Sequence, residues 1–276
     1  MFRSRARTSS REGARAGRTR RIGSPVDAVL GAIIDRSYTA AEKRWVDRIE
    51  QRRRALCASP DVIEYVDYGA GSASATRTAE EMERGAPRKT AVADLTRIAS
   101  KSPTWAGLLF RLVRDLGPTR CLELGAAAGI SGAYQAAALE LNGAGRLTSL
   151  EGGASIAALA SSTLTALGLD QRADVRVGRF QDTLDDALSG GSCDYAFIDG
   201  HHDDDATRHY FDVITHRMRR PGLAVLDDIA WSPGMQAAWQ HVSRQPVVAA
   251  SFDLGAVGIC VVDEVRRPFH CTVDYA

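Results

Sequence analysis

Short apolar runs alternate with helical patterns through the second half of the chain. Five runs rich in Val, Leu, Ile and aromatic residues predict strands at 120–124, 146–150, 174–178, 194–199 and 223–228. The segments between them predict helices near 131–141, 154–168, 182–188 and 204–219. Strands that alternate with helices at this spacing indicate right-handed βαβ units and a parallel sheet covered by helices on both faces.

The end of the chain follows a different pattern. Two apolar runs, 246–254 and 257–265, are separated by a turn at Gly255-Ala256 and predict an antiparallel hairpin at the edge of the sheet. We therefore expect an α/β fold, built on a doubly wound, mostly parallel sheet of seven strands with an antiparallel C-terminal hairpin.

The N-terminal half predicts helices. Ser24-Pro25 has the form of a helix start, and apolar residues follow at helical spacing over 26–34. Further helices are predicted at 41–56, 92–99 and 103–115, with a flexible loop or lid at 69–75. We expect three parts: a disordered tail at 1–23, a helical region at 24–115 that covers the substrate, and a ligand-binding α/β domain at 116–276.

The charges divide the tail from the rest. The chain has 35 Lys and Arg against 34 Asp and Glu, but eight arginines and only one acid precede Ile22. Subtracting these leaves 27 basic and 33 acidic residues. A basic tail therefore precedes a body whose formal net charge is about −6. Binding of the tail to nucleic acid or to an acidic membrane is an alternative that we disfavour, because the tail has no aromatic residue after Phe2 for base stacking.

Composition excludes several classes of protein. No apolar run approaches the roughly 20 residues of a membrane-spanning helix. The five cysteines are scattered without a CxxC pair, which argues against a zinc ribbon or a disulfide scaffold and fits a reducing compartment. A secretory signal pattern is also missing. We expect a soluble cytoplasmic protein.

The turn after the first predicted strand is the first candidate binding site. Residues 123–129 read Glu-Leu-Gly-Ala-Ala-Ala-Gly, with Gly125 and Gly129 where the strand gives way to a helix. Glycines allow the backbone to approach a ligand there, and the helix start offers unpaired N–H groups. Doubly wound sheets bind nucleotide-type ligands at this point. The dinucleotide motif GxGxxG is not met, because Ala127 fills its second glycine position, and a turn used only for packing would look the same.

The next two strand ends suit the rest of a nucleotide-type ligand. Glu151 ends the second strand and can accept hydrogen bonds from both hydroxyls of a ribose. The stretch 178–182, which contains Phe180, follows the third strand, where a purine ring would be sandwiched. The alternatives are a solvated strand end for Glu151 and a core position for Phe180.

Acidic residues end the fourth and fifth strands. Asp199, Asp227 and Asp228 are expected on one edge of the sheet, where their mutual repulsion favours a bound cation. Such an oxygen-rich cluster suits Mg²⁺, Mn²⁺ or Ca²⁺. His201 and His202 follow the fourth strand and can add a ligand or a general base. The alternative is that Asp199 caps the next helix and Asp228 binds loop amides.

Together these residues resemble a class I S-adenosylmethionine-dependent methyltransferase, over about Ala91 to Val265. The resemblance is closest to small-molecule O-methyltransferases related to catechol O-methyltransferase, through the runs IDGHH at 198–202 and DDIAWSPGM at 227–235. It implies a Rossmann-like fold, S-adenosylmethionine as cofactor, a divalent cation such as Mg²⁺, and a small-molecule acceptor. Residues 116–276 would then be the S-adenosylmethionine-binding methyltransferase domain.

The resemblance also implies roles for individual residues. It assigns to the cofactor Ser102, Glu123, Gly125, Ala127, Gly129, Ser131, Glu151, Gly152, Phe180, Gln181 and Asp199. It assigns to the metal Asp199, Asp227 and Asp228, and to catalysis His202, with His201 as the alternative base. The segment 101–105 resembles the stretch that closes over the cofactor. Two positions depart from the pattern: related bacterial proteins often carry His at the position of Ala230, and the catechol enzymes carry Lys at that of His202.

Our hypothesis is cation-assisted methyl transfer to an oxygen of a small molecule. The alternatives are a metal-independent N- or carboxyl-methyltransferase, a nicotinamide-dependent oxidoreductase and a cofactor-binding protein without catalysis. Several aromatic residues are compatible with an aromatic acceptor and equally with core packing: Trp45, Tyr65, Tyr68, Trp105 and Trp231. The apolar face at 26–34 is compatible with a homodimer.

Overall fold

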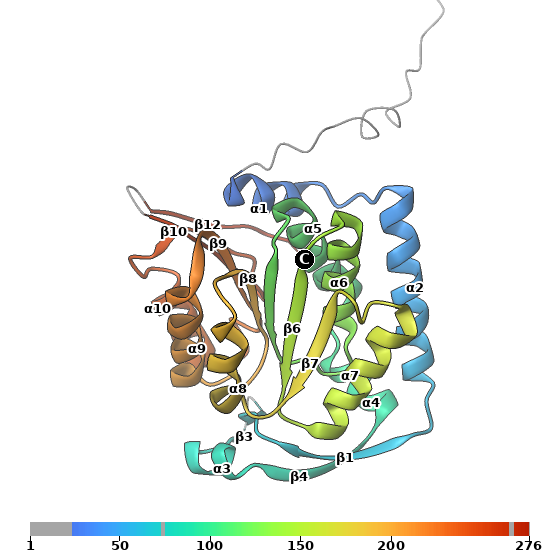
Figure 1. The fold of residues 1–276 in the computed structure, drawn as a ribbon. Helices are drawn as coiled ribbons and strands as arrows, with labels where there is room; N and C mark the ends of the chain where they lie inside the picture. The colour runs from blue at the N-terminus through green and yellow to red at the C-terminus, as the bar shows by residue number, and fades with distance from the viewer. Residues whose placement is uncertain (1–23, 73–74, 265–267, 276) are drawn as a thin grey trace, which may run out of the picture.

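One sheet of eight strands forms the centre of the protein, in the order β12-β10-β11-β9-β8-β5-β6-β7 (Figure 1). The computed structural model describes residues 24–72, 75–264 and 268–275, so the predicted tail at 1–23 lies outside the described residues. The parallel strands are β5 (Arg120–Leu124), β6 (Arg146–Glu151), β7 (Ala173–Val177), β8 (Cys193–Ile198) and β9 (Met218–Leu226).

The other end of the sheet is mixed. Strand β11 (Gly258–Val262) runs antiparallel to β9 on one side and to β10 (Val248–Asp253) on the other, which confirms the predicted hairpin. The eighth strand, β12 (Phe269–Thr272), pairs parallel to β10 and was not expected. Its four residues are mostly exposed, so they carry no apolar pattern that marks a strand.

The central strands are apolar throughout because both of their faces are covered. In β8, Tyr195 and Phe197 point into one core and Ala196 and Ile198 into the other. The first core is shared with α1, α2, α5, α6 and α7, and the second with α8, α9 and α10. This arrangement confirms the predicted doubly wound α/β fold.

The helices that follow the strands are close to the predicted ones. They are α6 (Ile130–Asn142), α7 (Ala154–Leu167), α8 (Phe180–Ser189), α9 (Asp204–His216) and α10 (Pro233–Val242). Helix α10 is the exception, because no helix was predicted at 233–242. Its start carries a recognisable signal, because the Ser232 hydroxyl accepts a hydrogen bond from the Met235 backbone N–H and Pro233 occupies the first turn.

The N-terminal helices pack against the sheet domain. They are α1 (Pro25–Ile34), α2 (Ala40–Cys57), α4 (Val92–Ala99) and α5 (Pro103–Leu116). Buried Arg111 of α5 ties them to the end of the chain: its guanidinium donates to the carbonyl of Ala32 at 3.0 Å, the hydroxyl of Tyr38 at 3.2 Å and that of Tyr275 at 2.6 Å. Helices α1 and α5 therefore share one core with the sheet.

Residues 62–91 form a ribbon with a short helix at its far end. Strands β1 (Val62–Asp67) and β4 (Ala86–Ala91) pair antiparallel, with β2 (Gly71–Ser72), β3 (Ala75–Thr76) and α3 (Ala79–Arg84) between them. Figure 1 shows this ribbon across one end of the sheet, opposite the end where α1 lies. We name residues 62–91 the ribbon below.

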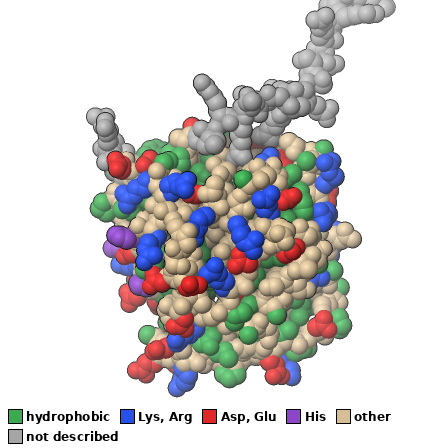
Figure 2. All heavy atoms as spheres, in the orientation of Figure 1, with side chains coloured by type: hydrophobic (Ala, Val, Ile, Leu, Met, Phe, Trp, Pro, Cys, Tyr) green, Lys and Arg blue, Asp and Glu red, His purple; other side chains and the backbone are tan. Residues whose placement is uncertain are grey.

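Helix character and surface charge are two further properties of the described residues. None of the helices in the described part of the chain combines the length and the apolar character needed to cross a membrane. On the face seen in Figure 2, acidic and basic side chains of the described residues are interspersed rather than gathered by sign.

We predict that two identical chemical changes in the core have different effects on stability. Tyr275→Phe deprives the buried Arg111 guanidinium of an acceptor, which should lower the free energy of unfolding by about 1–3 kcal/mol. Tyr195→Phe is the matched control, because the fully buried Tyr195 hydroxyl has no hydrogen-bond partner among the described residues. This variant should be as stable as the wild type or more so. Urea unfolding followed by circular dichroism measures both, and equal losses would contradict the prediction.

Candidate functional site

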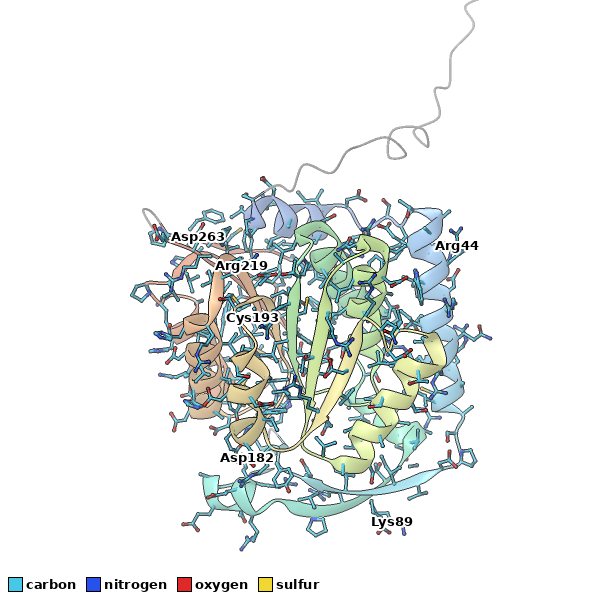
Figure 3. All side chains as sticks on the ribbon, viewed as in Figure 1. Arg44, Lys89, Asp182, Cys193, Arg219 and Asp263 are labelled. Carbon is cyan, nitrogen blue, oxygen red and sulfur yellow. The ribbon has the colours of Figure 1, made fainter. Side chains whose placement is uncertain are left out.

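A cavity of about 430 Å³ lies between the ribbon and the carboxyl ends of the parallel strands. Figure 3 shows the same end of the sheet, with Asp182 at the start of α8 and Lys89 on the ribbon. The sheet side of the cavity is lined by Gly125, Ala127, Glu151, Gly152, Phe180, Gln181, Asp199, His201, His202 and Asp228, all of which are candidate site residues from the sequence.

The two glycines of the first turn have different surroundings. Gly125 has φ of 95°, and a Cβ atom there would lie 1.9 Å from the carbonyl oxygen of Asp199, so only glycine fits. Gly129 has φ of 78° and faces α7, where a Cβ atom would lie 2.9 Å from Ala160 Cα. Gly125 lines the cavity, whereas Gly129 allows α6 and α7 to pack closely.

Glu151 is held at the end of β6 by backbone amides. Its carboxylate accepts hydrogen bonds from the N–H of Ala127 at 3.1 Å and of Gly153 at 3.0 Å. Burial raises the pKa of this carboxyl, although the same hydrogen bonds oppose the shift. Glu151 lines the cavity and a carboxylate can accept about four hydrogen bonds, so Glu151 can accept further ones from a ligand.

Glu123 is buried beneath the turn at 125–129 and does not line the cavity. It is fully buried and accepts hydrogen bonds from Gln135 Nε2 at 2.7 Å and from the Ser149 hydroxyl. Burial raises the pKa of Glu123 to about 7, although hydrogen bonds from Ser149 and Ser131 oppose the shift. Ser131 is buried beside it, whereas Ser102 is exposed at the start of α5 and also does not line the cavity.

An aromatic wall closes the side of the cavity at α8. The Phe180 ring lies against Gly200, where a Cβ atom would lie 2.7 Å from it, and meets the Tyr210 ring edge-on at 5.7 Å. His201 Nδ1 is 2.9 Å from the Tyr210 hydroxyl, and burial lowers the pKa of His201. His201 is therefore held against this wall, where burial disfavours its charged form.

His202 lies between two carboxylates. Its Nε2 is 3.9 Å from Asp199 Oδ1, and its Nδ1 is 3.7 Å from Asp228 Oδ2. The Trp231 ring lies 5.4 Å away, centre to centre. Asp199, His202 and Asp228 each offer an atom within 4.8 Å of the others, close enough for the three to share a metal ion.

Asp227, the third predicted metal ligand, forms an ion pair that was not predicted from the sequence. Lys101, in the loop before α5, pairs through Nζ with Asp227 and lies 3.4 Å from Asp199 Oδ2. Burial raises the pKa of the Asp199 carboxyl, although the charges of Lys101 and His202 oppose the shift. Lys101 lines the cavity and Asp227 lies behind it.

Backbone strain is concentrated at the cavity. The non-glycine residues with positive φ in the described part of the chain are Ala127, His201, His202 and Asp228, and all of them line it. Such conformations each cost of order 1–3 kcal/mol and are typical of binding and active sites. The strain supports the interpretation of this cavity as the functional site.

The ribbon and α4 supply the remaining wall, which the sequence indicated only in part. Tyr65 and Tyr68 of the ribbon were candidates as aromatic residues, whereas Asp67 of the ribbon and Leu95 and Ile98 of α4 were not identified. A Cβ atom on Gly152 would lie 2.9 Å from the Tyr68 ring, so ribbon and sheet are in contact. Three hydrogen bonds hold the ribbon down: Ala70 N–H to the His201 carbonyl (2.9 Å), the Ser155 hydroxyl to the Glu64 carbonyl (2.8 Å) and Arg179 Nη1 to the Glu83 carbonyl (3.3 Å).

Ala230, the position where related proteins often carry histidine, lies outside the cavity described above. Ala230 lines a second cavity of about 460 Å³, formed by α10 and the strands β10 and β12. It is not among the residues that line the first cavity. The position at which related proteins often carry histidine therefore does not line the cavity that contains His202.

We predict that Glu123 makes stability depend on pH. Its pKa is about 7 in the folded protein against 4.5 for an exposed group, so between these values the folded protein holds a proton that the unfolded chain has released. The free energy of unfolding should therefore fall by up to about 3 kcal/mol as pH rises from about 4.5 to about 7. Glu123→Gln should flatten this slope in urea unfolding.

The exposed Glu140 provides the control for this experiment, because Glu140→Gln should keep the wild-type slope. Equal slopes in the wild type and Glu123→Gln would contradict the assignment.

Comparisons with known proteins agree with this geometry. Residues 122–229 match a family model described as a methyltransferase domain. Comparison with curated protein sequences gives no match. Among solved structures, cofactor-bound Rv0187 from MTB is 20% identical, with a TM-score of 0.56 over 88% of this chain and 98% of that chain.

Two further structures are similar over nearly their whole length. An O-methyltransferase from Bacillus cereus in complex with SAH is 18% identical, with a TM-score of 0.54 over 86% of this chain and 97% of that chain. The O-methyltransferase TomG from Streptomyces achromogenes, in complex with SAM, is 19% identical, with a TM-score of 0.53 over 90% and 100%. At these identities the likeness shows the fold. Residues 122–229 thus match a methyltransferase domain, within a chain whose fold is shared with these structures.

Proposed function

We propose that the protein transfers a methyl group from S-adenosylmethionine to an oxygen of a small molecule. One observation carries the proposal: a single cavity joins a nucleotide-type half, with Gly125, Glu151 and Phe180, to an acid–base half centred on His202. The similar structures named above include two O-methyltransferases, which supports oxygen as the acceptor atom.

The first half fits the cofactor by shape and by hydrogen-bonding capacity. Gly125 and Gly152 present backbone to the cavity, and Glu151 has lone pairs for the ribose hydroxyls. Phe180 offers a flat apolar surface for the adenine, with the Gln181 amide beside it. When bound there, S-adenosylmethionine supplies an electrophilic methyl group on a positively charged sulfur.

His202 is the proposed base. One of its ring nitrogens, Nδ1, is buried without a hydrogen-bond partner among the described residues. A proton taken from the acceptor hydroxyl would rest on the ring between Asp199 and Asp228, whose charges stabilise the imidazolium. His201 is the weaker candidate, because its Nδ1 already contacts the Tyr210 hydroxyl.

The walls of the second half suit an apolar or aromatic acceptor. Leu95 and Ile98 of α4 line the cavity, as does Trp231, whose ring lies 5.4 Å from that of His202. Side chains of this kind hold a ring by burial and stacking, and they place its hydroxyl by excluding other orientations. The proposal of a small-molecule acceptor rests on this wall.

The predicted divalent cation fits its predicted ligands poorly. The Lys101 ammonium already pairs with Asp227 and lies beside Asp199, so the three carboxylates do not enclose a space for an ion. Asp199, His202 and Asp228 are the described groups that are near enough to share one. No step of the proposed reaction is assigned to a metal. The cytoplasmic location, the homodimer and the three-part division of the chain stay predictions.

We predict that Gly125→Ala abolishes cofactor binding. The added Cβ atom would collide with the Asp199 carbonyl and displace the turn. Gly168→Ala is the matched control, since Gly168 has a similar positive φ of 73° but nothing within 4 Å of a Cβ atom. S-adenosylhomocysteine should raise the melting temperature of the wild type and of Gly168→Ala, but not of Gly125→Ala. A shift with NAD instead of S-adenosylhomocysteine would support the oxidoreductase alternative and overturn the proposal.

We predict that His202→Gln lowers turnover by about 10²–10⁴-fold, the usual contribution of a positioned base. S-adenosylhomocysteine should bind this variant as it binds the wild type, because His202 lies in the acid–base half of the cavity. Methyl transfer to a panel of phenols, alcohols, amines and carboxylates from labelled S-adenosylmethionine provides the measurement. The exposed His216 of α9 supplies the control, His216→Gln. Full turnover by His202→Gln would exclude this residue as the base, and preferred methylation of an amine or a carboxylate would exclude oxygen as the acceptor.

A further inference from the structure

The acidic cluster contains a cation that belongs to the chain itself. Asp199 and Asp227 end adjacent parallel strands, with side chains that are 11% and 2% exposed. The side chain of Lys101 is 15% exposed and its ammonium contacts both carboxylates. Among the described residues, Lys101 is the one Lys or Arg that forms an ion pair with Asp199, Asp227 or Asp228.

Electrostatics explains why this ammonium matters. Two neighbouring carboxylates repel each other strongly when they are shielded from water, so one of them takes a proton unless a positive charge lies between them. A buried carboxylate that loses its partner is left with an uncompensated charge, which is strongly destabilising. Lys101 meets this requirement for Asp199 and Asp227 together, and it does so without an external ion.

The ammonium also has one donor to spare. Lys carries three N–H groups, and two carboxylates use two of them. Lys101 lines the cavity whereas Asp227 does not, so the third donor is available to a molecule bound there. His202, which lies 3.9 Å from Asp199, is close enough that an acceptor oxygen between His202 and Lys101 could contact both.

We propose that Lys101 supplies the positive charge that the sequence assigns to a divalent cation in this cluster, and that its remaining N–H binds the acceptor oxygen. The second half of this statement rests on the proposed function. In that reaction the acceptor O–H bond breaks, its proton moves to His202, and the negative oxygen that remains is stabilised by the Lys101 ammonium. The oxygen then forms a bond to the methyl carbon as the carbon–sulfur bond breaks.

The proposal restricts the class of acceptor. A divalent ion can chelate two neighbouring oxygens of a substrate, whereas an ammonium with a single free N–H binds one. We therefore expect a molecule with a lone hydroxyl, such as a simple phenol, to be methylated as well as its counterpart with two adjacent hydroxyls. A strong preference for the adjacent pair would contradict this expectation.

Binding of Mn²⁺ to the purified chain, measured by thermal shift and by electron paramagnetic resonance, tests the role of Lys101 without cofactor or acceptor. The wild type should show no Mn²⁺-dependent shift. Lys101→Met keeps the apolar stem but removes the charge, so it should bind Mn²⁺ and gain stability from it, and a second change, Asp227→Asn, should abolish that gain. Lys101→Arg keeps the charge and should behave as the wild type.

The exposed Lys89 of the ribbon provides the matched control, because Lys89→Met should leave Mn²⁺ binding as in the wild type. Turnover should fall in Lys101→Met and recover in part when Mn²⁺ is added, whereas chelation should leave wild-type turnover unchanged. Mn²⁺ binding by the wild type that Asp199→Asn removes would overturn the proposal, as would loss of wild-type turnover on chelation. Failure of the wild type to bind S-adenosylhomocysteine would instead refute the proposed function, and the Mn²⁺ comparison would still stand.

Discussion

The close contact between the backbone of Gly125 and the carbonyl of Asp199 determines the shape of the whole site. It brings the ends of β5 and β8 so near to each other that no side chain fits between them. The turn that presents Ala127 to Glu151 and the loop that carries His201 and His202 therefore leave the sheet side by side. The nucleotide-type half and the acid–base half of the cavity are adjacent because these two strands are neighbours.

The periodic parts of the fold were predictable, because their burial is regular. Strands such as β5 and β8 are buried on both faces and produce continuous apolar runs, so their limits were predicted within a residue or two. The ribbon has no such signal: β4 reads APRKTA and is mostly exposed. The short edge strand β12 is similar. Both owe their structure to pairing with a partner strand rather than to their own pattern.

The site residues also differ in how far they could be predicted, because some are placed by strand topology and others only by tertiary packing. Residues at strand ends, such as Glu151 and Asp199, could be placed from the sequence because topology brings parallel strand ends together. The partner of Asp227 could not, because Lys101 lies 126 positions earlier and reaches it only after α4 and α5 have packed. A stretch containing Lys101 was recognised as a closing segment, but the direction of its side chain depends on the tertiary structure.

The hydrogen bond from the Ala70 N–H to the His201 carbonyl links the ribbon to a strained loop. Any displacement of the ribbon from the sheet would have to break this bond. The same loop carries His202, whose ring lies between Asp199 and Asp228. In the proposed reaction, the placement of the base therefore depends on a segment about 130 residues earlier in the chain as well as on the sheet.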